Sequence, residues 1–115
     1  MGVDLSFCDF KFTYRNFACF RRKLALEIGV EYDEMESCGG NLSWDEVHDP
    51  LVPFLSACDC DGEISPHDCP FIANRLREIV AASPDDPKNY WKVRALDIAE
   101  AMEIAADKGQ VFRLS

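Results

Sequence analysis

The chain has 115 residues, a formal net charge of −9 and a hydrophobic fraction of 48%. This length suits a single domain, residues 1–115, with a core large enough that the fold needs no disulfide or metal to stabilise it. No apolar run approaches the roughly 20 residues of a membrane-spanning helix, and Asp4 and Asp9 interrupt the apolar start, so we expect a cytoplasmic protein without a membrane partner.

The negative charge is concentrated in the middle of the chain. Between Leu24 and Asn74 there is no Lys or Arg, and the same span has twelve acidic residues. The flanks together have twelve basic and nine acidic residues, so a middle of −12 lies between ends that sum to +3. This asymmetry predicts a basic protein partner and opposes direct binding to nucleic acid.

The N-terminal third predicts a hairpin followed by a helix. Apolar residues alternate in two registers over residues 3–14, which indicates two strands with a turn or bulge at Cys8–Asp9. Asn16 is the expected N-cap of a helix that runs to Ile28, with Gly29 as its left-handed end. A short turn of helix is expected over Asp33–Ser37.

The rest of the chain predicts three further helices and a strand. Ser43 and Glu46 have the spacing of a capping box, and Asp49–Pro50 indicates a short buried helix. Further helix starts are expected at Ser65–Pro66 and Asp86–Pro87, the last helix ends at Lys108 before Gly109, and Val111–Leu114 is extended. The sequence therefore predicts an α+β fold, in which a short antiparallel sheet of the N-terminal hairpin and the C-terminal strand packs on about four helices, with a helix-loop-helix in the middle.

Residues 57–68 partly match the twelve-residue calcium loop of an EF-hand. With Gly62 in the sixth position, the expected oxygen ligands are Asp59, Asp61, the carbonyl of Glu63, Ser65 and Asp68. Ala57 supplies no side-chain oxygen at the first position, and Asp68 replaces the usual bidentate Glu, so only weak calcium binding is expected, and no other cofactor. The alternative is an Asp-Gly turn whose carboxylates accept local backbone N–H bonds.

The same stretch contains the residue types that zinc prefers, Cys58, Cys60, His67 and Cys69. His67 and Cys69 lie two positions apart at a helix start, so they point to nearly opposite sides. The spacing of Cys58 and Cys60 is shorter than the usual structural pattern. Buried thiols explain these residues better than a zinc site does.

The segment Ala57-Cys58-Asp59-Cys60-Asp61-Gly62-Glu63-Ile64-Ser65-Pro66-His67-Asp68-Cys69 resembles a motif in a group of small, uncharacterised bacterial and phage proteins. That motif reads like His-Ser-Asp-Cys-Asp-Gly-Glu-Ile-Ser-Pro-x-x-Cys, and this chain departs from it at Ala57 and Cys58. Residues 49–53 and Phe17-x-x-Phe20-Arg21 are also similar. The resemblance implies a small cytoplasmic protein and brings no activity, ligand or partner with it.

The sequence offers little for catalysis. Only His48 and His67 can act as bases near neutral pH, and the chain has no phosphate-binding loop, nucleophile elbow or paired metal-binding His motif. Arg21 and its basic neighbours in the first helix are expected to form a solvated face. We therefore expect a non-enzymatic binding or regulatory protein with residues 57–68 as its best site.

Two alternatives remain open. One is a phage-type anti-defence inhibitor or DNA mimic, whose acidic surface occupies the basic groove of a nuclease, repressor or restriction factor. The other is a thiol or metal-assisted enzyme that uses Cys69 near His67.

Overall fold

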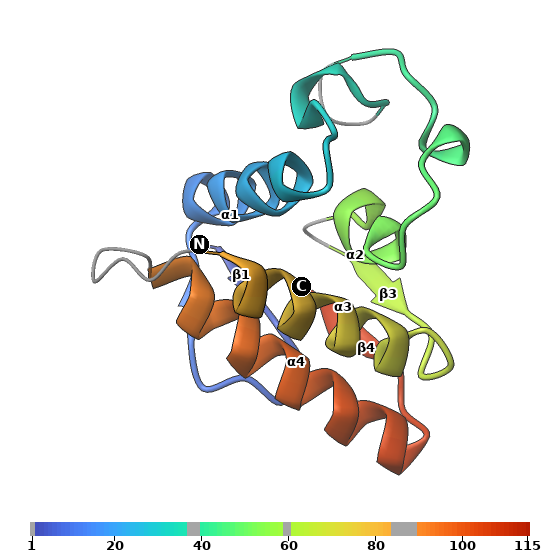
Figure 1. Ribbon diagram of the computed structural model, residues 1–115. Coiled ribbons are helices and arrows are strands. Elements are labelled where there is room, and N and C mark those ends of the chain that lie inside the picture. The colour runs from blue at the N-terminus through green and yellow to red at the C-terminus, as the bar shows by residue number, and fades with distance from the viewer. Residues whose placement is uncertain (1, 37–39, 59–60, 84–89) are drawn as a thin grey trace.

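The computed structural model describes residues 2–36, 40–58, 61–83 and 90–115 (Figure 1). Within these ranges it contains four α-helices and two short antiparallel strand pairs, which confirms the predicted α+β class. In chain order the elements are β1 (Val3–Asp4), β2 (Lys11–Phe12), α1 (Tyr14–Glu27), the 3₁₀ helices η1 (Tyr32–Glu34) and η2 (Trp44–Glu46), α2 (Val52–Ser56), β3 (Gly62–Ile64), α3 (Cys69–Ala82), α4 (Tyr90–Lys108) and β4 (Phe112–Leu114).

The N-terminal hairpin forms where the alternation of apolar residues predicts it. Strand β1 pairs antiparallel with β2, and Val3 lies opposite Phe12 with both side chains buried. The chain reverses over residues 5–10, where Phe7 has a φ of 60°. A left-handed residue beside the predicted Cys8–Asp9 break explains why the apolar register changes there.

Strand β3 was not predicted, because residues 57–68 were interpreted as one loop. It pairs antiparallel with β4, and Gly62 and Ile64 are buried while Glu63 between them is exposed, as expected for a sheet with one face on the core. The expected pairing of the C-terminal strand with the N-terminus also occurs. The backbone N–H of Asp4 donates to the carbonyl of Ser115 at 2.7 Å, so β4 joins the two strand pairs.

Helix α1 begins at a different residue from the one predicted. Thr13 is its N-cap, and the Thr13 hydroxyl accepts from the backbone N–H of Asn16 at 3.1 Å, so Asn16 lies inside the first turn. The helix ends as predicted: Gly29 has a φ of +78°, and the N–H of Val30 donates to the carbonyl of Ala25. This is the left-handed ending that glycine favours.

Helix α3 begins at Cys69, three residues later than the predicted start at Pro66. The Ser65 hydroxyl accepts from the backbone N–H of His67 at 3.1 Å, so it caps a separate turn rather than the helix. The predicted start of the last helix at residues 86–87 lies outside the described residues. Its predicted end is confirmed, because α4 stops at Lys108 and Gly109 has a φ of +62°.

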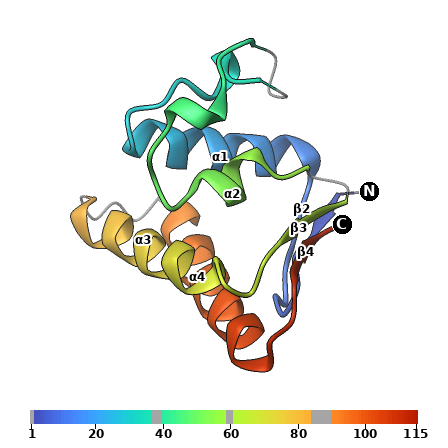
Figure 2. The ribbon, with the colours of Figure 1, turned by 90° about the vertical axis from the view of Figure 1, so that its right-hand side faces the viewer.

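The core lies between the helices and the strands. Figure 2 shows the strands gathered on one side, α3 and α4 on the opposite side, and α1 with α2 across the top. Aromatic rings fill the space beneath α1, where the centroids of Phe17 and Phe20 lie 5.9 and 6.2 Å from that of Phe54. Among the described residues, no helix is both long enough and apolar enough to cross a membrane.

Candidate binding site

The acidic middle of the chain forms an arm above the helices, which we define as residues 29–36 and 40–47 (Figure 1). The arm includes η1 and η2, which are separate from the strands and from α1 to α4. Six carboxylates of the arm are exposed: Glu31, Asp33, Glu34, Glu36, Asp45 and Glu46. The arm itself has no Lys or Arg, and one of its carboxylates, Asp33, is paired with Arg22 of α1.

The acidic arm has a small apolar interior of its own. Met35 and Trp44 are buried, and the indole N–H of Trp44 donates to the carbonyl of Glu36 at 3.1 Å. The backbone N–H of Leu42 donates to the carbonyl of Glu34 at 2.9 Å, which closes the arm on itself. Gly40 is required at this closure, because a Cβ there would lie 2.1 Å from the carbonyl oxygen of Glu34.

The predicted helical features within the arm are only partly present. The predicted turn over Asp33–Ser37 is η1, which begins at Tyr32; Ser37 lies outside the described residues. In the predicted capping box, the Ser43 hydroxyl accepts from the N–H of Asp45 at 3.1 Å. A 3₁₀ turn follows this cap instead of a longer helix, because η2 ends at Glu46.

A shallow cavity of about 310 Å³ lies in the arm, and we call it the acidic groove. Its lining combines apolar side chains with three carboxylates and has no basic residue: Gly29, Val30, Glu31, Glu34, Met35, Leu42, Ser43, Glu46 and Val47. Leu42 is 51% exposed, and its backbone is held by two hydrogen bonds, to Glu34 and to Glu36. The groove therefore presents an apolar contact area surrounded by negative charge.

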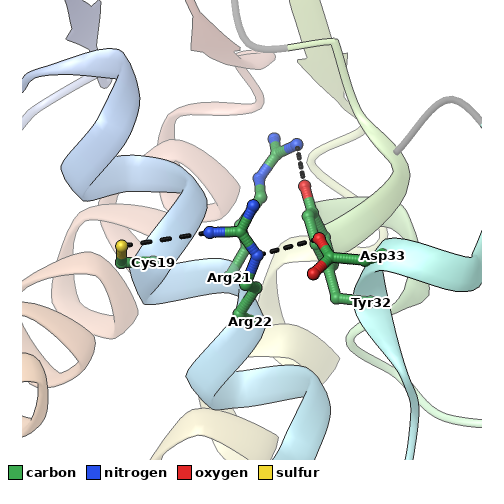
Figure 3. A network of polar contacts seen from close by, with 5 residues as sticks. All are labelled: Cys19, Arg21, Arg22, Tyr32 and Asp33. Carbon is green, nitrogen blue, oxygen red and sulfur yellow. Dashed lines mark hydrogen bonds and ion pairs between the residues drawn. The ribbon is translucent and has the colours of Figure 1, made fainter. Parts of the chain in front are cut away.

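Helix α1 anchors the arm through two adjacent arginines (Figure 3). The Nε of Arg22 donates to the Oδ1 of Asp33 at 2.8 Å, and this hydrogen bond raises the pKa of the Arg22 guanidinium. The Nη1 of Arg21 donates to the hydroxyl of Tyr32 at 3.4 Å. These contacts connect η1 to α1, so the position of the groove is set by a rigid helix.

Arg21 corrects one prediction, because its side chain is 4% exposed and does not belong to a solvated face. Its guanidinium lies over the ring of Phe17, with Cζ 4.3 Å from the centroid, and Nη1 also donates to the carbonyl of Leu55. Within the described residues, its Nε and Nη2 have no hydrogen-bond partner. The sequence contains a signal for this burial, because position 21 follows Phe17 by four residues and precedes Leu24 by three and so lies on the same helical stripe; the prediction followed the charge of Arg21 instead of this spacing.

The expected calcium ligands are spread over three kinds of local structure. Asp59 lies outside the described residues, and Asp61 is an exposed residue of the turn before β3. Glu63 is within β3, and its carboxylate forms an ion pair with Arg113 at 3.2 Å. Ser65 caps the turn before α3, and Asp68 immediately precedes that helix without capping it through its side chain.

Metal binding by this stretch stays a prediction. The described residues include no cluster of three or more His, Cys, Asp or Glu that could hold a metal ion. Gly62 fits the Asp-Gly turn, because a Cβ there would lie 2.3 Å from the carbonyl oxygen of Cys58. The predicted helix start at Ser65–Pro66, the ninth and tenth positions of the loop, is wrong, since α3 begins at Cys69.

The candidate zinc and thiol residues differ in their surroundings. Cys58 and His67 are exposed, Cys60 lies outside the described residues, and Cys69 is fully buried. Burial and the nearby Asp68 raise the pKa of the Cys69 thiol to about 11. At neutral pH this thiol is protonated, which opposes the nucleophilic role of the enzyme alternative.

The acidic groove itself was missed in the sequence. Its apolar residues are single positions among acids, without the period of a strand or a helix, and only the folding of the arm brings Val30, Leu42 and Val47 together. No family model, curated protein or solved structure matches the chain.

Proposed function

We propose that this chain is a non-enzymatic binding protein that recognises a basic segment of a partner protein through the acidic groove. The observation that carries the proposal is the lining of the groove, where apolar side chains are combined with Glu31, Glu34 and Glu46 and with no base. A partner segment with an apolar side chain between Lys or Arg residues complements both properties.

The physical contributions of the two properties differ. Burying an apolar side chain of the partner against Leu42 supplies affinity, at about 25 cal/mol per Å² of apolar area. The surrounding carboxylates supply fast, salt-sensitive association and select basic partners. Since the groove is small, we expect one anchor side chain in the groove and a weak or transient complex.

The experiment uses a labelled nine-residue peptide with one central Leu and four Lys on each side. Its affinity for the unmodified protein is compared with that for the triple variant Glu31→Gln, Glu34→Gln, Glu46→Gln. We expect the variant to bind at least about tenfold more weakly, because three rim charges at roughly 0.5 kcal/mol each amount to about one factor of ten. Fluorescence anisotropy at low salt measures the change.

The matched control is Glu78→Gln, Glu100→Gln, Asp107→Asn, which removes three exposed acids outside the arm. We expect it to change the affinity less than twofold. Equal losses in the two triple variants would contradict the proposal, because binding would then depend on net charge alone.

The variant Leu42→Ser separates this proposal from DNA mimicry. A mimic of nucleic acid uses the pattern of negative charge, so a loss of apolar contact would leave its binding unchanged. A peptide anchored in the groove loses affinity when Leu42 becomes polar. Unchanged peptide affinity in the Leu42→Ser protein would therefore favour mimicry over the proposed recognition.

A further inference from the structure

A second cavity, of about 500 Å³, has the opposite charge from the acidic groove. It lies between β2, one face of α1 and the first turns of α4, which run below α1 in Figure 1. We call it the basic cavity, and its lining is Lys11, Phe12, Asn16, Cys19, Phe20, Lys23, Trp91 and Arg94. The lining residues lie up to 83 positions apart in the sequence, from Lys11 to Arg94, so no local sequence motif predicts the cavity.

The charged residues that line the basic cavity are all positive, although the net charge of the protein is negative. Lys11, Lys23 and Arg94 are contributed by three different elements, and no acidic residue of the described ranges lines the cavity. In a chain with a net charge of −9, the lining of this cavity has three bases and no acid, and the carboxylates that pair with these bases, Asp4, Glu27 and Asp97, lie outside the lining. Such a lining attracts a small anion.

Each of the three basic side chains already has an acidic partner, and the Cζ of Arg94 also lies 4.2 Å from the centroid of the Phe10 ring. Lys11 pairs with Asp4 at 3.3 Å, Lys23 with Glu27 at 3.1 Å, and Arg94 with Asp97 at 3.9 Å. Five of these six side chains are at least 40% exposed, and the sixth, Glu27, is 29% exposed. Exposed ion pairs are individually weak, so an anion in the cavity can replace or share these contacts.

Aromatic side chains give the cavity an apolar wall. The rings of Phe12 and Phe20 are stacked, with centroids 5.3 Å apart, and both residues are buried. Trp91 is half-buried at the start of α4, and the Nζ of Lys23 lies 5.5 Å from the centroid of its ring. Because Phe12 and Phe20 are buried, the half-buried Trp91 supplies the accessible aromatic surface, and a planar ring placed against it gains stacking energy.

We propose that the basic cavity binds a nucleoside monophosphate, with the base against the aromatic wall and the phosphate near Lys11, Lys23 and Arg94. The volume lies within the range of small-molecule sites, about 300 to 1,000 Å³. A mononucleotide suits the site better than a nucleic acid strand, because the net charge of −9 repels a polyanion outside the cavity. This inference is independent of the proposed partner binding by the acidic groove.

Calorimetric titration of the unmodified protein with AMP tests the inference, with adenosine and inorganic phosphate as separate ligands. We expect AMP to bind at least tenfold more tightly than either, because only AMP combines the ring with the anion. No heat with millimolar AMP would overturn the proposal, and so would tighter binding of a single-stranded oligonucleotide than of AMP.

Variants locate the binding site. Lys23→Gln with Arg94→Gln removes two charges from the cavity, and we expect at least a tenfold loss of AMP affinity. Arg77→Gln with Arg113→Gln makes the same change of charge at exposed ion pairs outside the cavity, and we expect less than a twofold loss. Equal losses in the two double variants would overturn the proposal; circular dichroism verifies that both variants are folded.

Discussion

Arg21 combines a buried charge with incomplete hydrogen bonding. Its guanidinium rests on the rings of Phe17 and Phe54, which replaces part of the lost hydration by cation–π contact. Among the described residues it has no carboxylate partner, and burying a charge in this way carries a cost in stability. What the side chain provides is a fixed connection from α1 to Tyr32 and therefore to the acidic arm.

Cys8 is a second residue whose surroundings in the folded protein affect its charge, because they raise the pKa of its thiol. It lies beside α4, and burial, Asp97 and Asp9 raise the pKa of its thiol to about 12, while Arg94 acts in the opposite direction. The folded state therefore holds the thiol proton at pH values where the unfolded chain has already released it. Folding stability must then fall as the pH rises between the two pKa values.

We expect the free energy of unfolding to decrease from about pH 9 to about pH 12, the window set by the ordinary thiol pKa and the raised one. Urea denaturation at several pH values measures this decrease. Cys8→Ala should make the pH dependence flatter, whereas Cys19→Ala, at an exposed position, should leave it unchanged. A Cys8→Ala protein with the same slope as the unmodified protein would contradict the expectation.

At the scale of elements, β3 shows how a turn sequence becomes part of a sheet. Gly62, the first residue of β3, is needed for the close approach of the backbone, since a Cβ there would meet the carbonyl of Cys58. The three residues of β3 are enough to pair with β4 and to place Ile64 in the core.

Gly62→Ala should be more destabilising than Gly109→Ala. At Gly109 an added Cβ meets nothing within 4 Å, so the cost is that of the left-handed φ of +62°, about 1 kcal/mol. At Gly62 the clash is with a backbone atom, so β3 must shift, and we expect a loss of more than about 2 kcal/mol. Chemical denaturation of both variants measures the difference, and equal losses would show that β3 can relax.

At the scale of the whole molecule, β4 joins parts of the chain that are far apart in sequence. The backbone N–H of Arg113 donates to the hydroxyl of Ser6 at 2.9 Å, and β4 also pairs with β3. Phe112 and Leu114 are buried completely, so the last strand contributes to both the sheet and the core. Strand β4 therefore connects the N-terminal segment with β3 in the middle of the chain.

Removal of residues 111–115 should abolish cooperative folding. The deletion exposes the edge of β3 and removes two buried side chains worth about 1.5 to 3 kcal/mol each, a large part of the stability of a small domain. Thermal and urea unfolding followed by circular dichroism would reveal the loss. Arg113→Ala, which removes only an exposed ion pair, should unfold cooperatively like the unmodified protein; a cooperative transition in the truncated chain would contradict the expectation.

The opposite charges of the acidic arm and the basic cavity are also a property of the whole molecule. The sequence shows a middle of −12 and ends that sum to +3, but it does not show where these charges lie in space. Folding places six arm carboxylates on one part of the surface and three bases around a cavity between α1, β2 and α4. Two cavities whose linings differ in charge are thereby present among the described residues.

The sequence by itself determined the features that depend on neighbouring residues. Alternation over residues 3–14 predicted the hairpin, and Gly29 and Gly109 predicted two helix ends, because a left-handed residue is a local requirement that glycine meets. Helix starts were less certain: Thr13 and Asn16 are both good caps, and only the fold selected between them. The tertiary structure alone decided the pairing of β3 with β4 and the lining of both cavities, because each depends on contacts between residues distant in sequence, for which the local pattern has no signal.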